Sequence, residues 1–349
     1  MKVFVTGGAG YIGSICVEQL LHRGHQVVVI DNLQEGHREA ITPQAEFYEG
    51  DYGDSALLKT IFSKHRIEVV FHFAGETTIE FSMTNPSPYF HNNLVKGITL
   101  LDVMLDFGCK DIIFSSTAAT FGEPEYVPID EKHPQRPINA YGESKLMFER
   151  VLEWYHRAYG LRFNIFRYFN ASGASERFGE DHVHESHLIP LVLKAALREK
   201  VKAKQELAKK DPPVTSNNNV QKTLSVYGHD YETKDRTCIR DYIHVIDLAQ
   251  AHILAIENLN KRSNAKYNLG NGEGFSVLEV IETAKKITGV DIPYQFADRR
   301  PGDPAILIAS SEKIKKELGW EPKYLDLETI IKTAWEWHCK HPQGYIVQW

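Results

Sequence analysis

Tyr141 and Lys145 combine a proton acceptor and a cation at a spacing that suits proton chemistry. They stand four residues apart at the start of an expected helix, so both side chains point from one face. Of the sixteen tyrosines in the chain, only Tyr141 has a lysine four residues later. A free tyrosine has a pKa of about 10, and lowering it by about three units requires about 4 kcal/mol. A phenolate stabilised in this way can take the proton of an alcohol, whereas the simpler alternative is a helix-start tyrosine beside a surface lysine.

Three hydroxyl side chains, Ser115-Ser116-Thr117, follow the end of a strand expected over 111–115. Ligand sites of open α/β sheets lie at the carboxyl ends of the strands. We therefore expect Thr117 to hydrogen-bond the same alcohol oxygen that Tyr141 would deprotonate.

The elements around these residues alternate between strand and helix. Apolar runs predict strands, and amphipathic stretches predict helices between them. This rhythm indicates right-handed crossovers and a doubly wound parallel sheet, an α/β fold of the Rossmann type. The expected strands cover 3–5, 26–30, 45–51, 67–73, 111–115 and 162–169, and the expected helices cover 14–23, 55–65, 89–107 and 143–159.

Gly7, Gly10 and Gly13 follow the first strand at three-residue spacing and precede a helix. Such a turn lets a pyrophosphate approach bare backbone at the positive end of a helix dipole. Asp31 ends the second strand, eighteen residues past Gly13, where a carboxylate would accept hydrogen bonds from an adenosine ribose. The pattern predicts NAD, because a carboxylate there would repel the 2′-phosphate of NADP. The positive nicotinamide ring would join Lys145 in stabilising the phenolate while hydride leaves the alcohol carbon.

The composition excludes several classes of protein. With 42% hydrophobic and 25% charged residues, the chain is an ordinary globular protein, and its net charge of −6 disfavours nucleic acid or an anionic membrane as partner. No apolar run reaches the roughly 18 residues of a membrane span, and glycines cut the first strand before it could serve as a signal peptide. We expect a cytoplasmic enzyme.

The cysteines and histidines do not predict a metal site. Four cysteines lie far apart and are expected to be reduced thiols. His182, His184 and His187 fall close together, but no acid or cysteine cluster at a recognisable spacing accompanies them, so we interpret them as solvated or hydrogen-bonded loop histidines.

The pattern loosens beyond Asn170, which predicts a second, smaller mixed α/β lobe. We expect an NAD-binding domain over 1–173, to which 238–262 returns, and a substrate lobe over 174–349. Helices are expected over 187–198, 245–259 and 277–288 and a strand over 224–227. Lysine-rich residues 199–222 are interpreted as a solvated polar insertion.

Longer motifs across nearly the whole chain resemble those of the UDP-glucose 4-epimerases, a family of extended short-chain dehydrogenases/reductases. They are the Gly-x-x-Gly-x-x-Gly turn, the Tyr-x-x-x-Lys pair, Arg167-Tyr-Phe-Asn170, Arg240-Asp-Tyr-Ile-His244, Tyr267-Asn-Leu-Gly270 and His341-Pro-Gln-Gly344. The resemblance implies retained NAD and interconversion of UDP-glucose and UDP-galactose. Oxidation at C4 would give a transient 4-keto sugar, which rotates and takes hydride back on its opposite face.

The resemblance also implies roles for particular residues. Tyr141 matches the family's base, Lys145 the lysine on the nicotinamide ribose, and Thr117 the group on the 4-hydroxyl. Arg240 and Arg300 match groups that grip the UDP pyrophosphate. The further cofactor-binding residues implied are Gly7, Gly10, Tyr11, Ile12, Gly13, Asp31, Asn32, Asp51, Tyr52, Phe73, Ala74, Gly75, Asn92, Ser115 and Tyr168. The further substrate-binding residues implied are Asn170, Leu188, Tyr227, Asp303 and Leu307.

The sugar remains open, because Glu76–Ser82 departs from the family's pattern where that segment borders the sugar. Another UDP-pentose, uronate or N-acetylhexosamine epimerase is an alternative, although Leu307 would crowd an N-acetyl group. A dehydratase would need an acid pair where Ala118 and Ala119 stand. An NAD-binding regulatory scaffold without turnover is the alternative from another class.

By analogy with the family, we expect a homodimer paired through the helices over 89–107 and 143–159. Leu94, Ile98 and Leu101 would give the first of these an apolar stripe.

Overall fold

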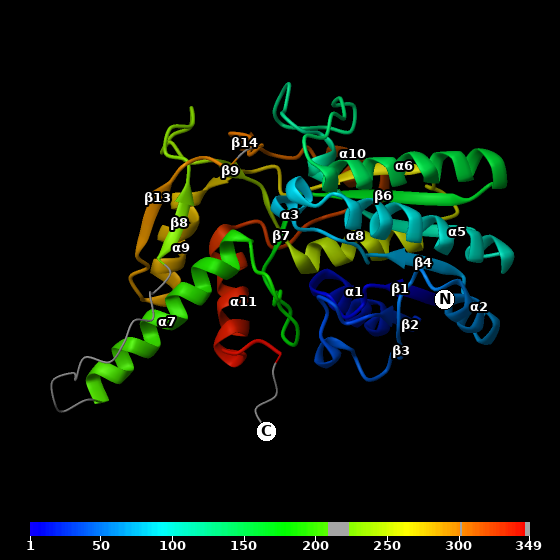
Figure 1. Cartoon of the computed structure of the whole chain (residues 1–349), viewed down its shortest axis with the longest axis horizontal. Coiled ribbons are helices and arrows are strands. Elements are labelled where there is room, and N and C mark those ends of the chain that lie inside the picture. The colour runs from blue at the N-terminus through cyan, green and yellow to red at the C-terminus, as the bar shows by residue number, and fades with distance from the viewer. Residues whose placement is uncertain (209–222, 301, 346–349) are drawn as a thin grey trace.

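A computed structural model of the chain describes residues 1–208, 223–300 and 302–345 (Figure 1). Seven parallel strands form its main sheet in the order β11-β6-β5-β4-β1-β2-β3. The order reverses between β1 and β4, and the central strand β1 pairs with β2 on one side and with β4 on the other. The strands are β1 (Lys2–Thr6), β2 (Gln26–Asp31), β3 (Glu46–Glu49), β4 (Val69–His72), β5 (Asp111–Thr117), β6 (Arg162–Tyr168) and β11 (Ala265–Leu269). The predicted doubly wound fold is confirmed.

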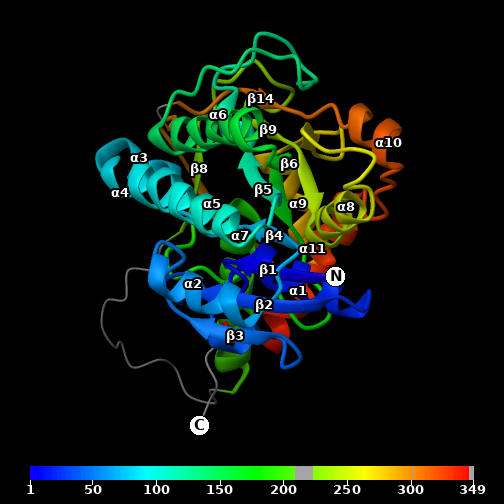
Figure 2. The same cartoon turned by 90° about the vertical axis from the view of Figure 1, so that its right-hand side faces the viewer.

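Helices cover both faces of this sheet (Figure 2). One face packs against α1 (Tyr11–His22), α8 (Val245–Glu257) and α10 (Glu312–Leu318), through residues such as Leu20 and Leu248. The other face packs against α2 (Ser55–Lys64), α5 (Lys96–Asp106) and α6 (Ala140–Tyr159), through Leu58, Leu100 and Phe148. Because both faces are covered, the central strands are continuous apolar runs, as in a parallel sheet.

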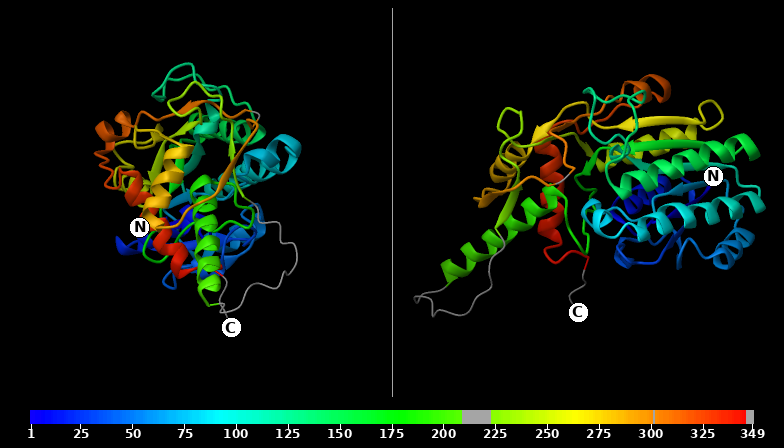
Figure 3. Two further views of the ribbon diagram at one scale, coloured as in Figure 1. Left: turned by 90° about the vertical axis from the view of Figure 1, so that its left-hand side faces the viewer. Right: turned by 45° about the horizontal axis from the view of Figure 1, so that its top comes forward.

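A smaller lobe lies beside the carboxyl ends of the strands (Figures 1 and 3). Its core gathers α7 (Leu188–Ala208), α9 (Val277–Thr288) and α11 (Leu327–Lys340). Its sheets are β12-β9-β14 and β13-β8, and the parallel pair β10-β7 lies between the lobes. Their bounds are β7 (Asn170–Ser172), β8 (Leu224–Tyr227), β9 (Ile239–Arg240), β10 (Tyr242–His244), β12 (Phe275–Ser276), β13 (Tyr294–Ala297) and β14 (Ile306–Leu307).

The first part of the predicted polar insertion is helical, so the predicted end of the preceding helix is wrong. Helix α7 continues to Ala208 instead of ending near Arg198, whereas 209–222 lies outside the described residues. The last residues of α7 are rich in alanine, lysine, glutamate and glutamine, which have high helix propensity. Residues 238–262 were expected to return to the NAD-binding domain, and strand β11 of the main sheet lies just beyond them. The division into two domains itself stays a prediction.

The segment before β5 contains more than the one predicted helix. A short helix α3 (Ile79–Thr84) was not expected, and the predicted helix over 89–107 consists of α4 (Ser87–Phe90), a π-helical turn over His91–Val95, and α5. The predicted apolar stripe on this helix is wrong in part, because Leu101 is fully buried in the core against the sheet. In the part of the chain that the structure describes, no helix is long and apolar enough to cross a membrane.

Candidate active site

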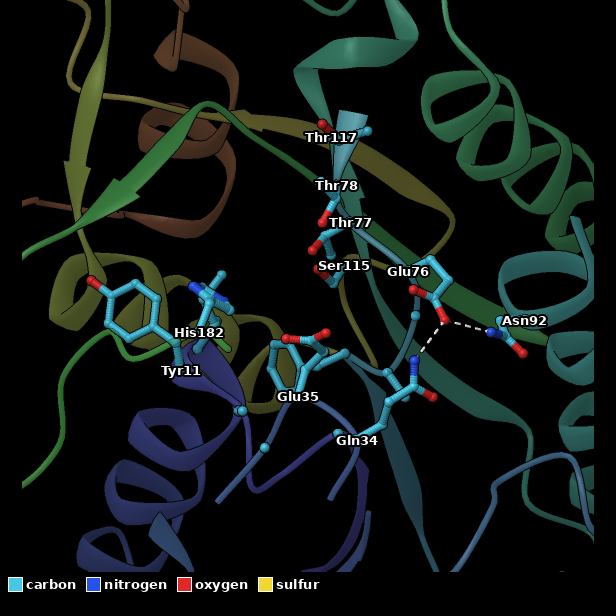
Figure 4. A pocket seen from close by; sticks show the side chains of 18 of the residues that line it. Tyr11, Gln34, Glu35, Glu76, Thr77, Thr78, Asn92, Ser115, Thr117 and His182 are labelled. Carbon is cyan, nitrogen blue, oxygen red and sulfur yellow. Dashed lines mark hydrogen bonds between the residues drawn. The ribbon is translucent and has the colours of Figure 1, made fainter. Parts of the chain in front are cut away.

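A cleft opens at the carboxyl ends of β1, β4 and β5, where the strand order reverses (Figure 4). This is the place where open α/β sheets bind their ligands. Most residues predicted for cofactor and catalysis line it together. They are Gly7, Gly10, Tyr11, Ile12, Gly13, Asp31, Asn32, Tyr52, Phe73, Ala74, Gly75, Asn92, Ser115, Thr117, Tyr141, Lys145, Tyr168 and Asn170.

The three glycines of the turn have three different reasons to be glycine. Gly7 has φ +74°, a conformation that favours glycine. A Cβ on Gly13 would stand 2.1 Å from the Gly7 carbonyl oxygen, so helix α1 could not pack against the turn. A Cβ on Gly10 would meet only that same oxygen, at an ordinary 3.5 Å, and would otherwise point into the cleft. The fold therefore does not require glycine at position 10, but a pyrophosphate lying on bare backbone does.

The start of helix α1 also suits an anion. Its N-cap residue, Gly10, has no side chain to cap the first amide groups, and the first turn contains no acidic residue. Unpaired amides and the dipole of a helix start attract negative charge. The turn and helix thus fit the diphosphate of a dinucleotide.

Asp31 lies at the end of β2 on the rim of the same cleft. Its carboxylate accepts hydrogen bonds from the backbone amides of Ala9 and Leu33, both at 2.9 Å. Burial raises the pKa of Asp31, and these two hydrogen bonds oppose the rise. Each carboxylate oxygen can accept a second hydrogen bond, so the side chain retains acceptors for a ribose.

Tyr141 and Lys145 project from the first turns of α6 toward the end of β5. The helix begins at Ala140 because the Asn139 side chain accepts a hydrogen bond from the Gly142 amide at 2.8 Å. The Lys145 ammonium donates to the Ser115 carbonyl at 3.0 Å and lies 4.9 Å from the centre of the Phe114 ring. These contacts fix the lysine beside the carboxyl end of β5.

The protein groups alone do not make Tyr141 a stronger acid. Burial raises the pKa of Tyr141, and its hydrogen bond with Thr117 opposes the rise. Burial also lowers the pKa of Lys145 from 10.5 to about 8. The lowering of the tyrosine pKa predicted from the sequence therefore depends on the positive nicotinamide ring as well as on the lysine.

A buried ion pair supports the catalytic face of α6 from behind. Glu149 lies two turns beyond Tyr141 on the same helix and binds Arg167 of β6 through two hydrogen bonds, of 2.7 and 3.1 Å. Both side chains are almost fully buried, at 0% and 1% exposed. Ser116 donates to the same carboxylate at 2.6 Å. The pair thereby joins α6, β5 and β6 next to Thr117.

One predicted cofactor residue has another partner. The Asp51 carboxylate does not line the cleft, but binds the Lys96 ammonium at 2.5 Å and the Gly53 amide at 2.7 Å. Lys96 does line the cleft, so Asp51 positions a cationic side chain there. This lysine was not predicted as a site residue.

The predicted uridine and diphosphate residues gather in the smaller lobe. Arg240 of β9 forms an ion pair with Asp303, and its backbone pairs with that of Leu307 in β14. The Arg300 guanidinium lies over the Tyr227 ring, 4.0 Å from its centre. Leu188 begins α7, next to the cleft residue His187. Asn170, which lines the cleft, donates its side-chain amide to the Asp241 carbonyl at 3.0 Å and thus contacts the loop after Arg240.

Two sets of contacts at the cleft were not predicted. Glu76 accepts hydrogen bonds from Asn92 at 2.6 Å and Gln34 at 3.2 Å (Figure 4). Across the cleft, Glu180, His182, Glu185 and His187 form a compact cluster, which corrects the statement that no acids accompany these histidines. The His187 side chain is 51% exposed. Its partial burial opposes protonation, but the Glu180 and Glu185 carboxylates outweigh this effect and raise the pKa of His187 to about 10. His184 is exposed, as expected for a loop histidine.

Comparisons with known proteins match the whole chain. The sequence model of the NAD dependent epimerase/dehydratase family matches residues 3–270. A curated UDP-glucose 4-epimerase of Halalkalibacterium halodurans is 50% identical, over 100% of this chain and 98% of that protein. A crystal structure of a UDP-glucose 4-epimerase superposes with a TM-score of 0.91 at 46% identity, over 99% of this chain and 100% of that one.

A second similar structure was solved with ligands bound. The UDP-glucose 4-epimerase of Bifidobacterium longum, solved in complex with NAD+ and UDP, superposes with a TM-score of 0.88 at 36% identity, over 99% of this chain and 100% of that one. The chain belongs to the NAD dependent epimerase/dehydratase family and is an NAD-dependent enzyme.

Proposed function

We propose that the chain is a cytoplasmic UDP-glucose 4-epimerase, an isomerase that interconverts UDP-glucose and UDP-galactose. The observation that carries this proposal is that Tyr141, Lys145 and Thr117 line the same cleft as the glycine turn. The names of relatives that match over the whole length support the same activity.

The catalytic residues would act at one oxygen of the sugar. When bound, NAD supplies a hydride acceptor and returns the hydride. Tyr141 takes the proton of the 4-hydroxyl group and later returns it, and Thr117 holds that oxygen by a hydrogen bond. Lys145 supplies positive charge, and its bond to the Ser115 carbonyl fixes where that charge lies.

The smaller lobe would hold the nucleotide. Arg240 and Arg300 are forked donors suited to a diphosphate, and each already has a fixed position, against Asp303 and over the Tyr227 ring. Asp303 would accept hydrogen bonds from the uridine ribose, and Leu188, Leu307 and Asn170 would complete the contacts. Firm nucleotide contacts and few sugar contacts suit a reaction in which the sugar turns between two hydride transfers.

Replacement of the base tests the activity. The purified protein is incubated with UDP-galactose, and UDP-glucose is measured with a coupled dehydrogenase. We expect Tyr141→Phe to lower kcat by about 10²- to 10⁴-fold while NAD remains bound. Tyr126→Phe, a change at an exposed tyrosine outside the cleft, is the matched control. Unchanged kcat in Tyr141→Phe would contradict the proposal, as would a wild-type protein that turns over no UDP-sugar, the outcome expected of a regulatory scaffold.

A 4-epimerase of another UDP-sugar is the second candidate, because Glu76, Thr77, Thr78 and Ile79 line the cleft and belong to the stretch that departs from the family's pattern. A panel of UDP-hexoses, pentoses, uronates and N-acetylhexosamines decides between the two. The substrate with the highest kcat/KM identifies the sugar.

The homodimer is a further part of the proposal. Helices α5 and α6 lie side by side, and α6 carries two large exposed aromatic side chains, with Trp154 65% and Tyr159 55% exposed. An apolar patch of this kind marks an interaction surface. We expect wild-type protein to have the mass of two chains by light scattering, and Trp154→Glu to shift it toward one. A single-chain mass for the wild type would refute the dimer.

A further inference from the structure

The segment between β7 and α7 brings four metal-ligating side chains to one point. Glu180, His182, Glu185 and His187 each offer one ligand atom, and these atoms all lie within 4.8 Å of one another. Glu180, His182 and His187 also line the catalytic cleft. Three of the four cluster residues are therefore part of the cleft wall, and Glu185 lies behind them.

Four of the contacts within the cluster are close in length to the distance between neighbouring ligands of a tetrahedral cation. With zinc–ligand bonds of about 2.0–2.1 Å, neighbouring ligands in a tetrahedron lie about 3.3–3.4 Å apart. His187 Nδ1 lies 2.9 Å from Glu180 Oε1 and 3.2 Å from Glu185 Oε1. His182 Nδ1 lies 3.5 Å from Glu180 Oε1 and 3.7 Å from Glu185 Oε2. These four contacts bracket the tetrahedral value and involve both oxygens of Glu185, one of which would bind the cation.

Hydrogen bonds within the cluster leave two of its atoms unsatisfied. His182 Nδ1 and Glu185 Oε2 are buried and have no hydrogen-bond partner. The Glu185 side chain is only 6% exposed, and the nearest ammonium, Lys194 Nζ, stands 3.9 Å from that oxygen. Buried polar atoms are normally paired, and because Glu185 Oε1 already contacts His187 at 3.2 Å, Oε2 is the carboxylate oxygen that lacks a close positive partner. A divalent cation among the four ligands would satisfy both atoms and neutralise both carboxylates.

We propose that Glu180, His182, Glu185 and His187 bind one divalent cation of the zinc class. Two imidazole nitrogens and two carboxylate oxygens suit Zn²⁺, whereas Ca²⁺ and Mg²⁺ take all-oxygen sites. The cation fixes residues 180–187 against the start of α7 and so shapes one wall of the cleft. Its role is structural, and it takes no part in hydride or proton transfer.

Metal titration tests the site without any substrate. Tag-free protein is treated with a chelator, exchanged into metal-free buffer and titrated with ZnCl₂ against a competing chromophoric chelator. We expect one equivalent of zinc to bind the wild type and no competition from Mg²⁺. His182→Gln removes a direct ligand and is expected to weaken zinc binding by at least about 100-fold, since loss of an outer-shell partner alone costs about 10- to 100-fold. His184→Gln is the matched control, because this histidine belongs to the same segment but not to the cluster, and it should bind like the wild type.

A spectroscopic measurement distinguishes loss of the metal site from unfolding of the protein. Co²⁺ in place of zinc should give the visible absorption of a tetrahedral site in the wild type, and this absorption should be absent in His182→Gln while far-ultraviolet circular dichroism is unchanged. The proposal is overturned if the wild type takes up no zinc at ~10 µM free metal, or if His184→Gln weakens binding as much as His182→Gln. The titration uses neither NAD nor a UDP-sugar, so its failure leaves the epimerase proposal untouched.

Discussion

Replacement of Gly10 by alanine separates what the fold requires from what the cofactor requires. The backbone at Gly10 has φ −79° and ψ 172°, which alanine adopts without strain, and its Cβ would meet protein atoms no closer than 3.5 Å. Alanine also restricts the unfolded chain more than glycine does. We therefore expect Gly10→Ala to raise the free energy of unfolding of the NAD-free protein by about 0.4–1 kcal/mol.

The same methyl group points into the cleft where the diphosphate of NAD would lie on the backbone. We expect NAD affinity to fall at least about tenfold, which corresponds to about 1.4 kcal/mol. Urea unfolding of the NAD-free protein measures the first effect, and calorimetric titration with NAD measures the second. The two effects have opposite signs, which a general loss of structure would not produce.

Gly13→Ala is the matched control for this experiment. Its Cβ would stand 2.1 Å from the Gly7 carbonyl oxygen, so the helix or the turn must move. Overpacking of this kind costs about 1–3 kcal/mol of stability. The reasoning is refuted if Gly10→Ala binds NAD as tightly as the wild type, or if it unfolds more easily than Gly13→Ala.

Three further changes test other parts of the site. Arg167→Met leaves the buried Glu149 carboxylate with only its longer ion pair, to Lys266 at 3.7 Å, and should lower the free energy of unfolding by about 3–5 kcal/mol in urea titrations, with a smaller loss in the double variant that also carries Glu149→Leu. Burial lowers the pKa of Lys145 to about 8, so the unfolded chain binds more protons between pH 8 and 10, and stability should rise with pH there by at most about 1.4 kcal/mol per unit. Lys145→Met should abolish that rise in unfolding experiments at pH 8 and pH 10, and an unchanged slope would contradict the buried ammonium. Leu307→Ala removes the side chain expected to crowd an N-acetyl group, so the ratio of kcat/KM for UDP-N-acetylglucosamine to that for UDP-glucose should rise about tenfold or more.

The sequence predicts the sheet and its cofactor turn well because their signals are local. Buried parallel strands must be apolar on both faces, so β1, β2 and β4 stand out as short runs of valine, isoleucine and phenylalanine. Tyr141 and Lys145 could likewise be paired from their spacing alone, because one helix carries both.

The errors in predicted secondary structure lie in segments whose composition is compatible with more than one structure. Lysine and glutamate near the end of α7 suggested a solvated loop, yet the same residues are good helix formers, and the helix continues to Ala208. The short helix α3 spans only six residues, buries Ser82 and exposes Ile79 and Phe81, so no hydrophobic periodicity marks it.

The cluster at 180–187 was missed for a different reason. Its ligands are spaced by two, three and two residues, which fits neither a helix face nor a strand face. Only the path of the loop brings the four ligand atoms together. Because the cluster depends on the irregular path of this segment, the spacing of its residues did not predict it.

Tyr141 and Lys145 could be identified as a pair from the sequence, but the pKa values of their side chains could not be predicted from it. A spacing of four residues places the ammonium near the phenol, but the pKa of each group depends on how much water the folded cleft excludes. Burial disfavours both charged forms, since it raises the pKa of Tyr141 and lowers that of Lys145. The protein alone therefore holds the phenol protonated. A positive ligand in the cleft would favour the phenolate, so we infer that proton transfer at Tyr141 becomes available only when the oxidised cofactor is bound.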